Sequence, residues 1–186
     1  MSNPILKFLI NRNSCPKLDD PGPSQQEISD ILQVAMRAPD HAWLRPWRFI
    51  TIEGERRNAF GEVLADCLIK RNPQADQAAV EKARAAPLRA PLLIAVAVAI
   101  SEHPKVPAVE QRLSAACAAH GILLAAEALG YGGIWRTGEA CFDSAVMAAI
   151  GLASNEELVG FIYLGSRQGA SKKLPSLDVD DFLTDW

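Results

Sequence analysis

Apolar residues recur at helical spacing in several stretches of the chain, and the clearest of these begins at Ser24. Ser24 and Glu27 form a Ser-x-x-Glu capping box, which satisfies the first free N–H groups of a helix. The apolar positions that follow at i, i+3, i+4 and i+7 are Ile28, Ile31, Leu32 and Ala35. Similar spacing or helix-forming composition predicts further helices over residues 4–10, 55–70, 76–86, 107–129 and 143–150.

Three other stretches are typical of β-strands. Residues 92–100 are a continuous apolar run, which we expect to form a central strand buried on both faces. Residues 48–53 are rich in β-branched and aromatic side chains, and residues 158–165 form another apolar strand. Residues 130–138 contain four glycines that let the backbone approach other backbone or a ligand closely. Because a helix precedes this segment and a strand follows, it is not a dinucleotide-binding fingerprint.

The predicted helix over residues 107–129 is rich in small residues and apolar almost all the way round. A helix of that kind is buried, so we expect it either at the centre of a subunit or between two subunits. His120 lies on it with no second ligand residue at i+3 or i+4, which favours a core histidine over a metal ligand.

Composition limits the class of protein. The chain has 186 residues, of which 49% are hydrophobic and 22% charged, and this fits one globular domain over residues 1–186. No run is long and apolar enough to span a membrane, and no export signal opens the sequence, so we expect a cytoplasmic protein without a membrane partner. The net charge of -3 predicts no nucleic-acid partner. The four cysteines lack the spacing of a zinc site, and we predict no metal.

The segment from Arg37 to Arg48 concentrates arginines and tryptophans around Pro39 and Pro46, which prevent regular structure. Guanidinium groups beside flat aromatic faces suit a planar anionic ligand, whereas a packed surface loop with solvated arginines is the alternative interpretation. A second polar turn, Asn11 to Ser14, offers a guanidinium, two amides and a hydroxyl for a phosphate. The tail over residues 166–186 carries Phe182 and Trp186, which predicts that it docks on the surface or on a partner subunit.

Taken in order, these motifs resemble the flavin-dependent nitroreductase family over nearly the whole chain. The resemblance rests on Asn-Arg-x-Ser at 11–14, Arg-Ala-Pro-Asp-His and Pro-Trp-x-Phe at 37–49, Lys-Val-Pro at 105–107, Gly-x-Gly-Gly-Ile-Trp-Arg at 130–136 and Gly-Phe-x-Tyr-Leu-Gly at 160–165. It implies an α+β three-layer sandwich with a mixed central sheet flanked by helices. It also implies a homodimer with one FMN in each of two clefts lined by both subunits.

The resemblance further implies which residues bind the cofactor. Arg12, Asn13 and Ser14 would contact the FMN phosphate and ribityl chain, where the family's short branch usually has two adjacent arginines in place of Arg12-Asn13. Arg37 and His41 would reach the same cofactor across the interface. The residues expected to complete the pocket are Trp135, Arg136 and Thr137. Those expected at the nicotinamide of the donor are Ala125, Ala126, Glu127, Ala128, Leu129 and Gly130.

The implied function is a flavin-dependent oxidoreductase that passes hydride from NADH or NADPH through FMN to a small-molecule acceptor such as a nitroaromatic or quinone. The alternative is an FMN-binding relative without reductase activity, acting in storage, sensing or partner binding. The sequence contains no nucleophile triad or metal motif, so we expect the cofactor rather than a catalytic side chain to carry the chemistry, with ping-pong kinetics.

Overall fold

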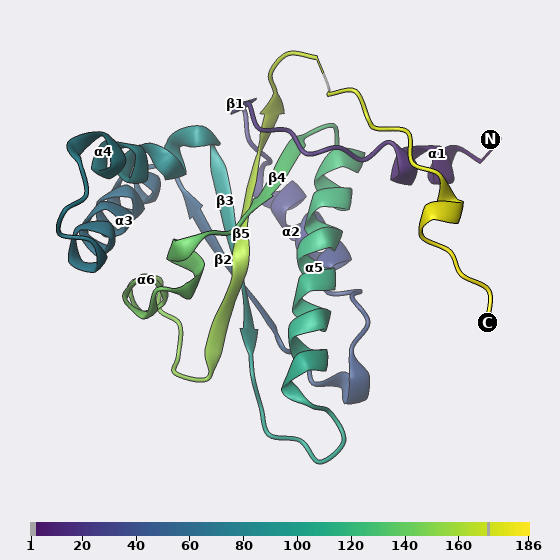
Figure 1. The fold of residues 1–186 in the computed structure, drawn as a ribbon. Coiled ribbons are helices and arrows are strands. Elements are labelled where there is room, and N and C mark those ends of the chain that lie inside the picture. The colour runs from purple at the N-terminus through teal and green to yellow at the C-terminus, as the bar shows by residue number, and fades with distance from the viewer. Residues whose placement is uncertain (1–2, 171) are drawn as a thin grey trace.

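A five-stranded sheet forms the centre of the computed structural model, which describes residues 3–170 and 172–186. Strands β2 (Trp47–Glu53), β3 (Leu92–Ala99) and β5 (Glu156–Arg167) lie side by side. The other edge of β5 pairs first with β4 (Gly132–Arg136) and then, at its end, with the two-residue β1 (Leu18–Asp19). Strand β5 therefore runs through the middle of the sheet and touches three of the other strands (Figure 1).

The predicted α+β fold is confirmed, but the prediction of a mixed sheet needs correction. Every strand pair among the described residues is antiparallel. Strands β3 and β4 do run in the same direction, since both are antiparallel to β5. They lie on opposite edges of β5, however, and do not pair with each other.

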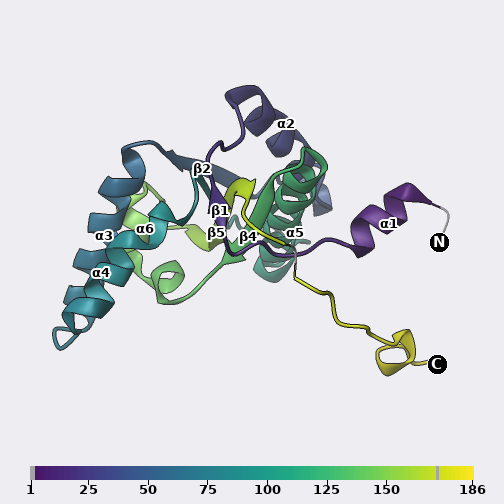
Figure 2. The same cartoon turned by 90° about the horizontal axis from the view of Figure 1, so that it is seen from above.

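Helices cover both faces of the sheet, which gives the predicted three layers (Figure 2). Helices α2 (Gln25–Ala35) and α5 (Ala108–Ala128) lie on one face and enclose a core that includes Ile31, Ile94 and Ile122. On the other face α3 (Arg56–Arg71) and α6 (Ser144–Ala149) enclose a second core with Phe60, Leu93 and Phe161, and α4 (Gln77–Ala85) packs against α3.

The predicted elements are present within a few residues of the expected bounds. Helix α1 spans Pro4–Ile10, and the Ser24–Glu27 capping box begins α2 as expected. All side chains of β3 but the last are buried, so it is the central strand that the apolar run predicts. The sequence did not predict β1, and it did not predict the short 3-10 helices η1 (His41–Trp43), η2 (Ala86–Arg89), η3 (Glu139–Phe142) and η4 (Val179–Asp181).

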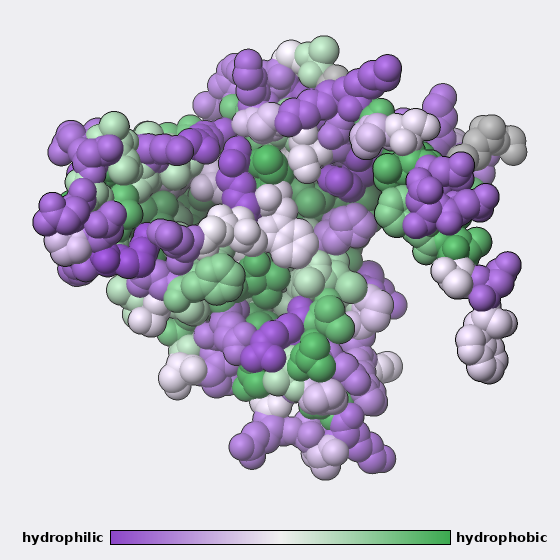
Figure 3. Space-filling model, viewed as in Figure 1, coloured by the Kyte–Doolittle hydropathy of each residue, from purple (hydrophilic) through white to green (hydrophobic). Residues whose placement is uncertain are grey.

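Helix α5 is buried on one side only in a single chain, although its sequence is apolar all round. Its inner side includes Ala115, Ala119 and Ile122, which are fully buried. On its outer side Val109 is 55% and Leu113 60% exposed. Figure 3 shows apolar atoms gathered over the lower part of this helix, on the side that faces the viewer. We call the outer side, with the adjoining Val34 and Pro39, the α5 face.

Both ends of the chain extend to the same side of the molecule (Figures 1 and 2). Helix α1 buries none of its residues. In the tail Leu177 is 69% and Phe182 76% exposed, so its apolar side chains remain uncovered within one chain. The Asn13 side-chain amide ties the two ends together by donating to the Lys172 carbonyl at 2.6 Å. Among the described residues, no helix has the length and apolar character needed to cross a membrane.

Gly61 sets how closely α3 and α4 approach. A Cβ atom at this position would lie 2.2 Å from the Arg84 carbonyl oxygen, and this obstacle is backbone that cannot rotate away. We expect Gly61→Ala to destabilise the protein by about 1–3 kcal/mol, because the overpacking outweighs the roughly 1 kcal/mol that alanine gains in a helix. Urea unfolding measures the change. A variant more stable than the parent would show that the two helices separate at little cost.

Candidate active site

The largest cavity described lies between the α3–α4 pair and the strands β4 and β5, and we call it the α4 cleft. Its volume is about 670 Å³. Its floor is the segment Trp135 to Gly138, where β4 ends, and its walls include the aromatic rings of Phe60, Phe161 and Tyr163. Three of the predicted cofactor-binding residues, Trp135, Arg136 and Thr137, therefore line one apolar cavity large enough for a planar ring system.

Positive charge surrounds this cleft. Lys82 from α4, Arg89 from η2 and Arg136 from β4 line it, against the single carboxylate of Glu139. The Arg136 guanidinium carbon lies 5.5 Å from the centre of the Tyr163 ring, and the Arg136 Nε is buried without a hydrogen-bond partner among the described residues. Burial raises the pKa of the Tyr163 phenol, so this ring is a neutral wall. The cleft thus combines aromatic surface with unsatisfied cationic donors, which suits an aromatic ring with electron-rich polar edges.

The glycines beside the cleft differ from the sequence interpretation. Gly132 and Gly133 lie within β4, and a Cβ atom on either would meet packed side chains, with Leu18 2.7 Å from the first and Leu123 2.8 Å from the second. These two glycines therefore allow close internal packing rather than the approach of a ligand. Gly138, which lines the cleft, is the exception. Its φ of +122° favours glycine, and a Cβ atom there would meet no other atom within 4 Å.

The turn from Arg12 to Ser14 lies beside the same strand. The Cys15 N–H donates to the Gly133 carbonyl at 2.9 Å, which fixes the turn against β4. Among the described residues, neither the Arg12 guanidinium nor the Ser14 hydroxyl has a hydrogen-bond partner, whereas the Asn13 amide is used in its contact with Lys172. Two of the three predicted phosphate contacts are therefore free to bind a ligand, and one is engaged with the tail.

Arg37 and His41 lie elsewhere in the chain. His41 Nδ1 is 2.7 Å from a carboxylate oxygen of Glu110, in the first turn of α5. The Arg12 turn and β4 lie near the other end of that helix, where Arg167 at the end of β5 pairs with Glu127 at 3.0 Å (Figure 1). Since α5 has 21 residues, its ends are separated by about 30 Å. One chain alone does not bring the two predicted sets of residues together.

The residues predicted for the nicotinamide occupy the C-terminal end of α5 and the turn after it. Ala126 is fully buried and Ala125 nearly so, while Glu127 makes the ion pair with Arg167. The negative end of the helix dipole lies here, which suits a cation better than a phosphate. The assignment of these residues to the nicotinamide therefore stays a prediction, and the geometry adds no support to it.

Comparisons with known proteins decide the family. The profile of the Nitroreductase family matches residues 9–166. The chain belongs to the nitroreductase family. The Escherichia coli K12 protein named "Putative NAD(P)H nitroreductase YdjA" is 43% identical over 176 residues, which cover 95% of this chain and 94% of that protein. A Haemophilus influenzae protein named "Putative NAD(P)H nitroreductase" is 33% identical over 96% of this chain and 97% of its own length.

Solved structures agree on the fold of this nitroreductase-family chain. A nitroreductase-like protein from Bacillus cereus superimposes with a TM-score of 0.84 at 18% identity, covering 100% of this chain and 97% of the other. A nitroreductase from Bacteroides fragilis, solved with bound FMN, has a TM-score of 0.76 at 21% identity and covers 100% of both chains. The predicted family and fold are thereby confirmed.

Sequence reasoning missed several residues of the α4 cleft. Lys82 lies in α4 and Arg89 in η2. The sequence of these elements predicts only a helix and the point where it ends. Nothing local indicates that these two cations face β4, because the α3–α4 packing that points them there is a long-range contact. Tyr163 lies within the Gly-Phe-x-Tyr-Leu-Gly motif, which was a signal available in the sequence.

Proposed function

We propose that this nitroreductase-family protein is an FMN-dependent oxidoreductase, which takes hydride from NADH or NADPH and passes it to a small-molecule acceptor such as a nitroaromatic or quinone. The observation that carries the proposal is the α4 cleft, which strand β4 connects to the Arg12 turn. The α4 cleft offers an aromatic cavity with cationic donors, and the Arg12 turn offers a guanidinium and a hydroxyl. A planar ring joined to a phosphate by a flexible chain fits that combination.

The residues present fit FMN by their chemistry. Arg12 would pair with the phosphate and Ser14 would donate its hydroxyl along the ribityl chain, with Asn13 holding the tail beside them. Trp135, Arg136 and Thr137 would line the ring, and the buried Arg136 Nε, which has no partner within the described residues, would gain an acceptor. Bound FMN supplies hydride acceptance and donation. The side chains would bind, orient and exclude water, and Arg136 would favour negative charge at the ring edge.

We further propose that the protein works as a homodimer built on the α5 face. If two copies of α5 pack antiparallel about a two-fold axis, the His41 end of one lies beside the Arg12 end of the other. Arg37 and His41 would then reach the partner's cofactor, although within one chain His41 lies at the far end of α5 and Arg37 beside the middle of that helix. Residues 1–186 would form a single domain whose tail covers its exposed apolar residues by docking on the partner subunit.

Two-substrate kinetics test the proposed function. Donor and acceptor that take turns at one site should give parallel double-reciprocal lines when both are varied, with the donor product released before the acceptor binds. Intersecting lines would contradict a shared site. Stoichiometric FMN without any turnover of either donor would favour the alternative, an FMN-binding relative without reductase activity.

A further inference from the structure

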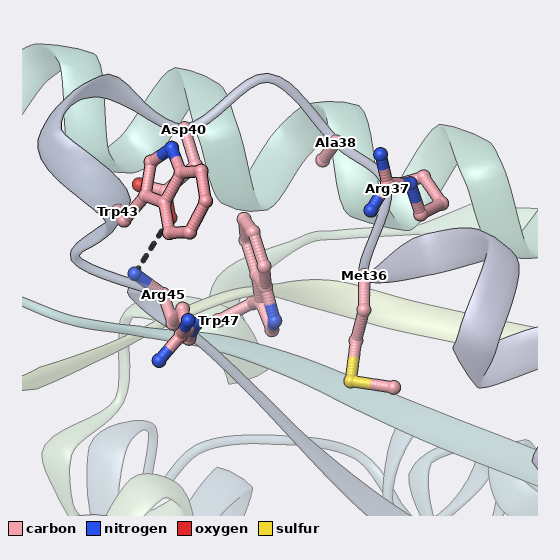
Figure 4. Close-up of a pocket in the computed structure, with 7 residues that line it drawn as sticks. All are labelled: Met36, Arg37, Ala38, Asp40, Trp43, Arg45 and Trp47. Atoms are coloured by element: carbon pink, nitrogen blue, oxygen red, sulfur yellow. Dashed lines mark hydrogen bonds between the residues drawn. The ribbon is translucent and has the colours of Figure 1, made fainter.

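A second, smaller cavity lies within the loop that joins α2 to β2, and we call it the Trp43 pocket. Its volume is about 240 Å³, which is enough for one ring system but not for a whole dinucleotide. Figure 4 shows the indole rings of Trp43 and Trp47 on one side of it, with Met36 and Arg37 on the other. The residues that line it are Met36, Arg37, Ala38, Asp40, Trp43, Arg45 and Trp47.

The backbone of this loop is held in an unfavourable conformation. Ala42, Trp43 and Arg45 have φ values of 61°, 55° and 50°, in the left-handed region that non-glycine residues rarely adopt. The Asp40 carboxylate fixes them by accepting the Leu44 N–H at 3.2 Å and the Arg45 N–H at 2.8 Å. Three strained residues in a row of four cost several kcal/mol together, and such strain concentrates at functional sites.

The strained loop also leaves a large aromatic ring uncovered. Trp43 is 78% exposed, and the Arg45 guanidinium lies over its ring at 6.0 Å from the centre. The strained residues therefore hold Trp43 at the pocket rather than in the core.

The charge in the pocket is positive and unpaired. Within the described residues neither Arg37 nor Arg45 has a carboxylate or hydrogen-bond partner for its guanidinium, whereas Arg48 pairs with Glu156 and Arg71 with Asp143. Of the residues that the structure describes, Asp40 is the only acid lining the pocket, and its two oxygens accept the two backbone N–H groups. Two guanidinium groups against one carboxylate leave a net charge of +1 beside two indole faces.

We infer that the Trp43 pocket binds a planar aromatic group that carries a carboxylate or phosphate. The ring would lie against the Trp43 and Trp47 indoles, and its anionic group would pair with Arg45. The inference deepens the proposed function and rests on it, because the proposed antiparallel dimer would bring this loop beside the Arg12 end of the partner subunit, where the FMN phosphate is proposed to bind. Besides FMN, for which a site is proposed above, two molecules of the reaction have this chemistry: an acceptor with an anionic substituent, and the adenosine-phosphate end of the donor.

Isothermal titration of the full-length protein as purified tests the inference without turnover. The probes are 4-nitrobenzoate, adenosine 2′-monophosphate and, as an uncharged reference, nitrobenzene. We expect Arg45→Gln to raise the dissociation constant of at least one anionic probe about tenfold, the loss typical of one charge-assisted hydrogen bond, and to leave nitrobenzene unchanged. Arg56→Gln removes the same charge from the exposed start of α3 and should change no probe.

The pattern of probes identifies the ligand. An effect on 4-nitrobenzoate alone indicates an anionic acceptor, and an effect on adenosine 2′-monophosphate alone indicates the donor and a preference for NADPH over NADH. Equal effects of Arg45→Gln and Arg56→Gln, or no measurable binding of either anionic probe to the parent protein, would overturn the inference. FMN content is measured in the same samples. A protein without FMN would contradict the proposed function, whereas a protein that contains FMN but does not bind the anionic probes would contradict this inference alone.

Discussion

Leu113→Asp is expected to convert the protein from a dimer into a monomer and to remove most of its FMN. Leu113 is 60% exposed on the α5 face, so a carboxylate there is solvated in one chain but would be buried between two. Burying an unpaired charge costs several kcal/mol, enough to prevent association at micromolar concentration. Sedimentation velocity measures the mass, and absorbance of the same fractions measures the flavin.

Ile69→Asp is the matched control for this experiment. Ile69 is an apolar residue of α3 that is 45% exposed, and α3 covers the opposite face of the sheet. The same change of chemistry at this position should leave both the mass and the flavin content unaltered. A Leu113→Asp protein that remains dimeric would rule out the α5 face as the interface, and a monomer that keeps its full FMN would show that one chain binds the cofactor alone.

Arg12→Ala is expected to weaken FMN binding about 10- to 150-fold. This range corresponds to the roughly 1.5–3 kcal/mol of a hydrogen bond to a charged group, at about 1.4 kcal/mol for each factor of ten. Arg12 has no side-chain partner within the described part of the chain, so its charge is available to a phosphate. Fluorescence titration of the apoprotein with FMN gives the dissociation constant.

Asn13→Ala provides the comparison at the next residue. Because the Asn13 amide donates to the Lys172 carbonyl, its loss should release the tail but change FMN affinity less than about threefold. Equal losses for the two variants would mean that the turn acts through its backbone shape rather than through the Arg12 charge. Asn13→Arg adds the charge that the family's short branch usually has, and it should tighten FMN only if the phosphate lacks a second partner.

Local signals predicted most of the secondary structure of this chain. The Ser24–Glu27 capping box and the apolar run at 92–100 each depend on neighbouring residues alone, and both gave the correct element. β1 could not be predicted, because its two residues form a strand only through their pairing with Ser166 and Arg167 at the far end of the chain. The antiparallel pairing of the sheet is a long-range property of the same kind.

The candidate site was predicted only in part for the same reason. Trp135 and Arg136 end β4 and Thr137 follows it directly, so all three line the same end of one cavity. Lys82 and Arg89 join them through the α3–α4 packing, which leaves no local mark in the sequence. His41 lies at the other end of α5 from the Arg12 turn, and Arg37 lies beside the middle of that helix. Their proposed contribution therefore depends on a second copy of the chain, which no local pattern in the sequence indicates.

The central claim is that this protein holds FMN and reduces it with a nicotinamide donor. Anaerobic titration of the purified protein with NADH and with NADPH tests it most directly. We predict about one FMN per chain, whose visible absorbance disappears stoichiometrically with at least one donor and returns when a nitroaromatic or quinone is added. A protein that carries FMN but whose spectrum neither donor changes, or one that binds no FMN at all, would contradict the account.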